Sequence, residues 1–89
     1  MRISEKKRDK ITEQILAYLY SINPKATFTS YIAEEIARDE EFVKKLLLGM
    51  KQKNLVIEIK KNPKGNPYLR RARWKLTEGA YGAYQQHQP

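Results

Sequence analysis

The chain has 89 residues, with 18 Lys and Arg against 10 Asp and Glu, and it contains no cysteine. This length allows one domain with a small core and leaves little room for the walls of a deep catalytic cleft. Without cysteine there are no disulfides or thiolate metal sites, and the single His87 stands in a polar tail, so we expect neither a metal nor a cofactor.

The sequence also lacks the signals of membrane proteins, secreted proteins and enzymes. No apolar run approaches the roughly 20 residues of a membrane-spanning helix, and the N-terminal MRISEKKRDK has no apolar centre. The acidic pairs Glu34-Glu35 and Glu40-Glu41 are helical neighbours whose side chains diverge by about 100°, so neither pair can converge on a substrate. We therefore expect a cytoplasmic protein that is not an enzyme and does not bind a membrane.

The excess positive charge is confined to the second half of the chain. Residues 1–43 hold seven Lys or Arg against eight Asp or Glu, a balance of −1, whereas residues 44–89 hold eleven against two, a balance of +9. Uncompensated charge of this kind repels itself unless a polyanion binds to it. Nucleic acid is the expected partner, and a nucleoid-associated location follows from it.

The first predicted element is a helix over residues 4–22. Ser4 is a suitable N-cap, and Asn23 followed by Pro24 marks the end of the helix. Apolar side chains recur at helical spacing, at Ile11, Ile15, Tyr18, Leu19 and Ile22. This side of the helix is predicted to face the core.

Two shorter helices are predicted next. Thr29 or Ser30 can cap a helix that ends near Ala37, and Asp39 caps another over residues 40–53. Asn54 then stands where a left-handed residue closes a helix. The apolar faces consist of Ile32, Ala33 and Ile36 in one helix and of Val43, Leu46, Leu47 and Met50 in the other.

The rest of the chain predicts a two-stranded hairpin and a short helix. LVIEIK (55–60) and YLRRARWKL (68–76) alternate apolar and polar residues, and NPKGNP between them has turn chemistry. On the second strand Tyr68, Ala72, Trp74 and Leu76 share one side, and we expect Trp74 to lie in the core. A last helix begins at Thr77, so that one domain spans residues 1–84 and residues 85–89 form a disordered tail.

This element order resembles that of a winged helix-turn-helix domain, an α+β fold with three helices and a two-stranded β-hairpin wing, here followed by a short C-terminal helix. ATFTSYIAEEIARDEEFVKKLLLGMKQKNLV is similar to the pattern in which a small helix with an Ile-Ala pair leads into a recognition helix closed by L-x-x-K-G-L-V. Met50 takes the place of that Leu, and Asn54 takes the place of the Gly.

A second stretch, RRARWKLTEGAYGAY, resembles the wing and exit of MarR- and PadR-type transcriptional regulators, which end the hairpin with an aromatic residue, one further residue and LTEKG. Trp74 is that aromatic residue, and Gly79 follows Glu78 directly, one residue short of the pattern. The resemblance covers about residues 11–84. It implies a transcriptional regulator that binds double-stranded DNA.

The outer face of the 40–53 helix carries the predicted base-reading residues. Opposite the core side lie Lys44, Lys45, Leu48 and Gln52, and Lys51 adds charge near the helix end. Lysine can contact phosphate or guanine, Gln52 can pair with adenine, and Leu48 can pack on a thymine methyl group. Glu40 and Glu41 repel DNA at the N-terminus of the helix, which leaves its middle for the contact.

Gly49 stands in the middle of the same helix, where glycine costs roughly 1 kcal/mol relative to alanine. Close approach of a neighbouring backbone is the expected reason. On the helical wheel Gly49 flanks the core, so we expect it to lie against another helix and to have no role in DNA binding.

The hairpin is predicted to be a basic ribbon. If Ala72 and Trp74 face the core, Arg71 and Arg73 face away from it. The predicted DNA-binding residues of the wing are Lys60, Lys61, Lys64, Arg70, Arg71 and Arg73. They are expected to reach phosphates or a narrow minor groove, for which the planar fork of arginine is well suited. Tyr31 can reach phosphate through its hydroxyl, but packing is the preferred interpretation.

Three functions remain open from the sequence. The first is sequence-specific binding of double-stranded DNA, the second is a winged-helix adaptor in which an exposed Leu48 docks a protein, and the third is an architectural or RNA-binding protein without base readout. The asymmetric charge favours the first and the third, whereas the position of Leu48 between acids and lysines favours the second. No pocket for a small-molecule effector is identifiable.

A homodimer is also predicted. The first helix has a second apolar strip, Leu16 and Tyr20, and the last helix offers Tyr81 and Tyr84 at i, i+3 spacing. A three-helix core is not expected to use both strips, so they are predicted to form a two-fold interface that presents two recognition helices to half-sites about one helical turn apart. The alternative is that these tyrosines cover the core of their own domain.

Overall fold

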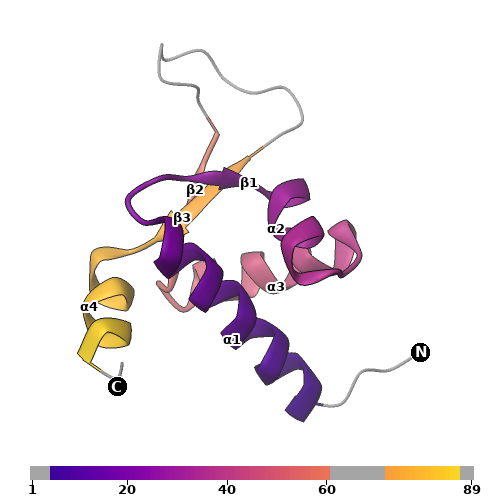
Figure 1. Cartoon of the computed structure of the whole chain (residues 1–89), viewed down its shortest axis with the longest axis horizontal. Coiled ribbons are helices and arrows are strands. Elements are labelled where there is room, and N and C mark those ends of the chain that lie inside the picture. The colour runs from indigo at the N-terminus through magenta and orange to yellow at the C-terminus, as the bar shows by residue number, and fades with distance from the viewer. Residues whose placement is uncertain (1–4, 61–71, 87–89) are drawn as a thin grey trace.

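The computed structural model describes residues 5–60 and 72–86. The elements are α1 (Glu5–Ile22), β1 (Thr27–Phe28), α2 (Thr29–Ile36), α3 (Glu40–Gln52), β2 (Val56–Ile59), β3 (Arg73–Leu76) and α4 (Glu78–Gln86). Figure 1 shows α1 crossing the middle of the molecule, with α2 on one side of it and α4 on the other. No helix in the two described ranges is long and apolar enough to cross a membrane.

The sheet has three antiparallel strands in the order β1-β3-β2, whereas the sequence predicted only the hairpin. Trp74 at the centre of β3 lies opposite Thr27 on one side and opposite Glu58 on the other. β1 has two residues, which is too short to show the alternation by which a strand is predicted. β3 begins at Arg73, and residues 68–71 of the predicted strand lie outside the described part of the chain.

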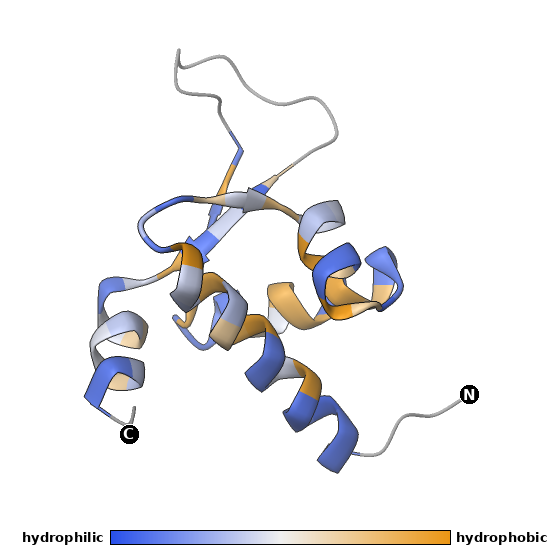
Figure 2. Cartoon of the chain, viewed as in Figure 1, coloured by the Kyte–Doolittle hydropathy of each residue, from blue (hydrophilic) through white to orange (hydrophobic). Residues whose placement is uncertain are grey.

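The helices and the inner face of the sheet enclose one hydrophobic core. Its buried members are Ile11, Ile15, Leu19, Ile32, Ala33, Val43, Leu46, Leu47, Met50, Val56, Trp74 and Leu76. In Figure 2, hydrophobic stretches of α1, α2 and α3 meet in the centre of the molecule, whereas the N-terminal turns of α1 are hydrophilic. The predicted apolar faces are confirmed, and Trp74 is a core residue with 0% exposure.

Both ends of α3 follow the prediction. Asp39 accepts a hydrogen bond from the Phe42 amide at 3.1 Å, which satisfies one of the N–H groups left over at a helix start. Asn54 adopts the left-handed conformation with φ 61°, as expected for the residue that closes the helix. α1 begins at Glu5, and its predicted cap Ser4 lies outside the described residues.

The start of α2 differs from the prediction. Neither Thr29 nor Ser30 is its cap, because Phe28 precedes the helix and, within the described residues, makes no side-chain cap hydrogen bond. The Thr29 hydroxyl instead accepts a hydrogen bond from the Nε1–H of Trp74 at 2.8 Å. A buried indole needs such a partner for its single polar atom. Local sequence could not show that the acceptor would come from 45 residues away.

α4 is fixed at its start by Thr77. The hydroxyl of Thr77 accepts a hydrogen bond from the Ala80 amide at 3.0 Å and donates one to the carbonyl of Asn54 at 2.8 Å. The helix continues through Gln86, so the predicted disordered tail 85–89 is wrong for its first two residues. The last three residues lie outside the described part of the chain.

Candidate nucleic-acid interface

The outer face of α3 presents the predicted base-reading side chains to solvent. The core residues of the helix lie on one side, and the opposite side exposes Lys44, Lys45, Leu48 and Gln52. Leu48 is 40% exposed although it belongs to a run of three leucines. Among the described residues, neither Lys44 nor Lys45 pairs with a carboxylate, so both charges are available to a ligand.

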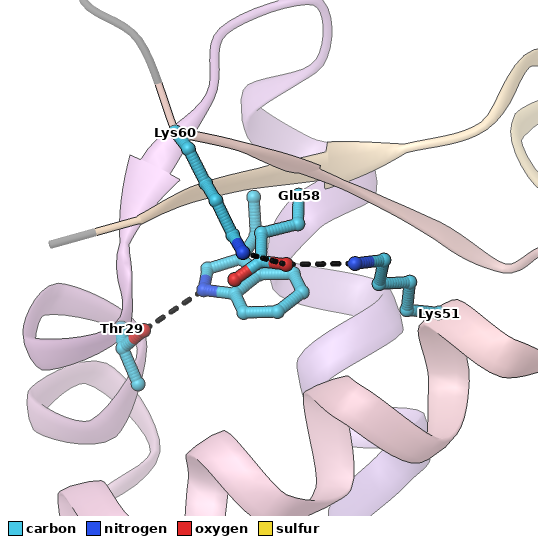
Figure 3. A network of polar contacts seen from close by, with 5 residues as sticks. Thr29, Lys51, Glu58 and Lys60 are labelled. Atoms are coloured by element: carbon cyan, nitrogen blue, oxygen red, sulfur yellow. Dashed lines mark hydrogen bonds and ion pairs between the residues drawn. The ribbon is translucent and has the colours of Figure 1, made fainter. Parts of the chain in front are cut away.

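Lys51, on the flank of α3, is bound to the sheet. Its Nζ lies 2.8 Å from Glu58 Oε1, and Lys60 Nζ lies 3.8 Å from the same oxygen (Figure 3). Two of the predicted DNA-binding lysines are therefore partly neutralised within the chain. Sequence reasoning missed this role of Glu58, and the available signal was that Glu58 is one of only two acids in residues 44–89.

β2 departs from the usual pattern of a surface strand at Ile57 and Glu58. A strand at the surface normally turns its apolar residues inward and its polar residues outward. In β2, Glu58 shares the inner face with the buried Val56, because it lies opposite Trp74, whereas Ile57 lies opposite Lys75 on the outer face and is exposed. The strand thus places a carboxylate against the helices and leaves an isoleucine in solvent.

Arg73 faces away from the helices, as predicted from the burial of Trp74, but its side chain is only partly exposed to solvent. Its backbone lies between Phe28 of β1 and Ile59 of β2. The side chain is half-buried, and its Nε atom has almost no contact with solvent. Part of this arginine is therefore withheld from a ligand. The other predicted cations of the wing, Lys61, Lys64, Arg70 and Arg71, lie outside the described residues.

Tyr31 lies near the same end of the sheet. Its ring meets the ring of Phe28 edge-on, with centroids 5.7 Å apart and an interplanar angle of 81°. The packing predicted for Tyr31 is present, but more than half of the residue is exposed. Its hydroxyl therefore remains accessible to a ligand.

The comparisons with known proteins identify the fold. No family model matches the sequence, and no curated protein is detectably similar to it. S. aureus MepR in a DNA-binding conformation is 19% identical, with a TM-score of 0.71 over 93% of this chain and 61% of that chain. A mutant of Lactococcus lactis ZitR is 22% identical, with a TM-score of 0.65 over 98% of this chain and 57% of that chain. The fold is a winged helix.

The resemblance found in the sequence is thus confirmed at the level of the fold, since MepR and ZitR are MarR-family winged-helix regulators. A MepR variant bound to an oligodeoxyribonucleotide is similar as well, with 22% identity and a TM-score of 0.62 over 92% of this chain and 67% of that chain. The chain spans less than two thirds of the first MepR and ZitR structures. In this winged helix, α2 and α3 form the helix-turn-helix, and β2 and β3 form the base of the wing.

The tyrosines predicted to form a dimer of the winged helix contact one another within the chain. The ring of Tyr20 stacks on Tyr81, with centroids 5.0 Å apart, and lies 4.7 Å from the ring of Tyr84. Leu16, Tyr20 and Tyr81 also pack against the edge of the core. The expectation that one domain cannot use both apolar strips is therefore wrong, because the strips of α1 and α4 meet. All four side chains remain partly exposed.

Gly49 of the winged helix borders a groove and not a helix. The groove has a volume of about 380 Å³ and lies between α1 and α3, with Arg8, Asp9, Lys45 and Lys53 among its lining residues. A Cβ atom placed on Gly49 would meet no atom of the described residues within 4 Å. The prediction that Gly49 lies against another helix is wrong, because the flank of α3 that it occupies is open at this point.

Proposed function

We propose that the chain is a sequence-specific double-stranded DNA-binding protein and a small regulator of transcription. The observation that carries this proposal is the outer face of α3, where lysine, leucine and glutamine project from a winged helix. The net charge of +8 supports a polyanionic partner. The similarity to MepR in a DNA-binding conformation and to a MepR variant bound to an oligodeoxyribonucleotide supports DNA.

In the proposed complex, α3 enters the major groove. Lys44 and Lys45 contact phosphate or guanine, Gln52 pairs with adenine, and Leu48 packs on a thymine methyl group. The acids Glu40 and Glu41 in the first turn of α3 disfavour phosphate there, so the middle of the helix makes the contact. The wing residues Lys60, Lys61, Lys64, Arg70, Arg71 and Arg73 then neutralise phosphates or enter the minor groove.

The experiment is selection from a random pool of duplexes, followed by fluorescence anisotropy on the selected and on a scrambled duplex. We expect enrichment of a defined sequence and tighter binding to it, with an affinity that falls as salt concentration rises. Binding that is equally tight on every duplex would favour the architectural function. No binding to any duplex would contradict the proposal.

A dimer is part of the proposal. Leu16, Tyr20, Tyr81 and Tyr84 are partly exposed on α1 and α4, and the ring of Tyr20 contacts the rings of Tyr81 and Tyr84. We propose that a second copy packs on this surface, which would present two α3 helices to half-sites about one helical turn apart. Sedimentation at high protein concentration should give a dimeric mass for the wild type and a monomeric mass for Tyr84→Ala. A regulator of this kind would be found in the cytoplasm with the nucleoid.

A second function, docking of a protein, is favoured by the 40% exposure of Leu48 on an otherwise polar surface. Leu48→Ala separates the two functions. If Leu48 reads thymine, the variant loses preference for the selected duplex. If Leu48 docks a protein, the variant keeps that preference.

A further inference from the structure

Glu58 carries a carboxylate that is almost fully buried. Its side chain is 7% exposed, and its Oε1 atom lies 2.8 Å from Lys51 Nζ and 3.8 Å from Lys60 Nζ (Figure 3). A carboxylate that loses water to this extent is unfavourable unless cations and hydrogen bonds replace the water. The two lysines provide that replacement, and Lys51 joins α3 to β2 at this oxygen.

The position of Glu58 follows from the register of β2 with β3. A register in which Ile57 pointed inward would expose the carboxylate but would also expose the buried Val56, since a shift of one residue exchanges the two faces of a strand. The chain has the opposite arrangement, with Ile57 exposed and Glu58 covered. The register that buries Val56 therefore also turns Glu58 inward, and the contact with Lys51 supplies the cation that the covered carboxylate requires.

The ion pair extends a series of contacts across the domain. Glu58 lies opposite Trp74, and Trp74 donates its Nε1–H to the Thr29 hydroxyl at the start of α2, 2.8 Å away. On its other side, Glu58 binds Lys51 in the last turn of α3. Figure 3 shows these contacts side by side, with Thr29, Glu58 and Lys51 coming from different elements. The two helices of the helix-turn-helix and the sheet are thus joined through polar groups as well as through the core.

The two lysines differ in how firmly they are held. The Lys51 side chain is 47% exposed and makes a direct hydrogen bond to Glu58, whereas the Lys60 side chain is 70% exposed and lies at 3.8 Å. Lys60 is also the last described residue before the predicted turn of the hairpin. Lys60 can therefore leave Glu58 for a phosphate at little cost, while Lys51 stays with Glu58 and keeps β2 attached to α3.

We propose that Glu58 is a positioning residue that fixes the direction of β2, at the base of the wing, relative to α3 and so determines how well both elements fit one DNA sequence. The inference rests on the proposed function. Two elements whose relative orientation is set in advance lose less conformational entropy on binding, and a duplex gains from this only if it fits both elements in that orientation. Glu58 itself is repelled by phosphate, so it supports specificity and opposes charge-driven affinity.

Glu58→Gln tests the proposal because a change in charge alters the affinity for every duplex alike, whereas a change in positioning alters the ratio of affinities for two duplexes. The variant gains one unit of positive charge and releases both lysines, so simple electrostatics predicts tighter binding to every duplex. Positioning predicts that the ratio of affinities for the selected and scrambled duplexes falls by roughly tenfold, which corresponds to about 1.4 kcal/mol. Glu13→Gln on the exposed surface of α1 makes the same change in net charge and should leave the ratio unchanged.

Glu58→Met separates positioning from stability. Removing one partner of a buried ion pair is costly when the other charge stays buried, but the side chains of Lys51 and Lys60 are 47% and 70% exposed and can turn to solvent. We therefore expect an unchanged or higher unfolding midpoint together with the same roughly tenfold loss of preference. Wild-type preference in both Glu58 variants would overturn the proposal. So would a proportional weakening on both duplexes, because that result indicates loss of folded protein and not loss of orientation.

The positioning role of Glu58 can also be tested without DNA, by measuring distances between α3 and β2. This test does not depend on the proposed function. The chain has no cysteine, so spin labels can be attached to Glu41→Cys on α3 and Ile57→Cys on β2, both of which are exposed. We expect a narrow distribution of label distances in the wild-type background and a broader one with Glu58→Gln. Identical distributions would overturn the positioning role even if DNA binds. If the wild type shows no preference among duplexes, the proposed function fails, and the distances still show whether Glu58 holds β2 to α3.

Discussion

The outer face of α3 and the base of the wing both carry several cations in the sequence. In the structure they differ in how many of those cations are exposed and unpaired within the described residues. On α3, Lys44 and Lys45 extend into solvent and, among the described residues, have no carboxylate partner. At the base of the wing, Lys60 lies 3.8 Å from a covered carboxylate, and Arg73 is half-buried between two neighbouring strands. The number of cations in a segment is therefore not the number available to DNA. On a helix, exposure follows from the position along the chain, whereas on a sheet it depends on the neighbouring strands.

The largest expected effect comes from removing the support beneath the base of the wing. Trp74 is fully buried and lies opposite Glu58. Trp74→Ala should lower the free energy of unfolding by about 3–5 kcal/mol, since it leaves a cavity and removes the hydrogen bond to Thr29. Urea denaturation monitored by circular dichroism measures this loss of stability. Tryptophan fluorescence cannot be used, because the variant lacks the single tryptophan of the chain.

Ile57→Ala is the matched control for Trp74→Ala on the outer face of the sheet. Ile57 is exposed, so this variant should change stability by about 0.5 kcal/mol or less. If the two variants lose the same stability, the two faces of the sheet are not as different as the structure indicates.

The next effect concerns DNA binding by the outer face of α3, which is compared with DNA binding by the wing. Leu48→Ala or Gln52→Ala should cost roughly 1–3 kcal/mol on the selected duplex only, because in the proposed complex these side chains contact bases and neutralise no phosphate. The slope of log affinity against log salt concentration should stay nearly constant. Anisotropy titrations on the selected and scrambled duplexes at several salt concentrations give both quantities.

Wing variants should behave differently in the same titrations. Lys60→Ala, Arg71→Ala or Arg73→Ala should weaken binding to all duplexes alike and reduce the salt slope by about 1 for each lost phosphate contact. Arg73→Ala should also lower stability, because part of the side chain is covered. Wild-type binding by all three variants would show that the wing does not contact DNA.

A smaller effect distinguishes the two kinds of lysine on α3. Lys51→Ala should lower the free energy of unfolding by roughly 1–2 kcal/mol, because it takes the nearer cation from a buried carboxylate. Lys44→Ala should change it by about 0.5 kcal/mol or less, since Lys44 is exposed. Thermal unfolding of both variants checks this. Equal losses would mean that the contact between Lys51 and Glu58 does not contribute to folding.

The features that the sequence predicts well are those set by local geometry. The apolar face of α3, its cap at Asp39 and the left-handed Asn54 depend on neighbours along the chain. The sequence also predicts which face of α3 remains for a ligand, since exposure is the complement of burial on a helix.

The features that the sequence does not predict depend on residues that are distant along the chain. β1 exists only because two residues pair with β3, and Thr29 is used by Trp74 instead of capping α2. The inward position of Glu58 is set by its register with Trp74, against the usual pattern of a surface strand. Contact between the apolar strips of α1 and α4 likewise depends on where the chain places α4 after β3.

The smallest expected effect concerns Gly49, on the flank of α3 away from Lys51. Glycine in a helix interior is less favourable than alanine by about 0.8–1.0 kcal/mol, and a Cβ atom at Gly49 has open space around it. Gly49→Ala should therefore raise the free energy of unfolding by about 0.5–1 kcal/mol. Gly79→Ala, in the first turn of α4 and with equally open surroundings, is the control for the same backbone change in a helix without buried residues.

Urea denaturation of both variants gives the gain in stability, and anisotropy on the selected duplex shows whether the groove beside Gly49 faces DNA. A stabilised Gly49→Ala with wild-type binding assigns the interface to the other flank of α3 and the wing. If binding weakens while stability rises, the groove takes part in the interface, and if stability falls, a neighbour approaches Gly49 more closely than the structure shows.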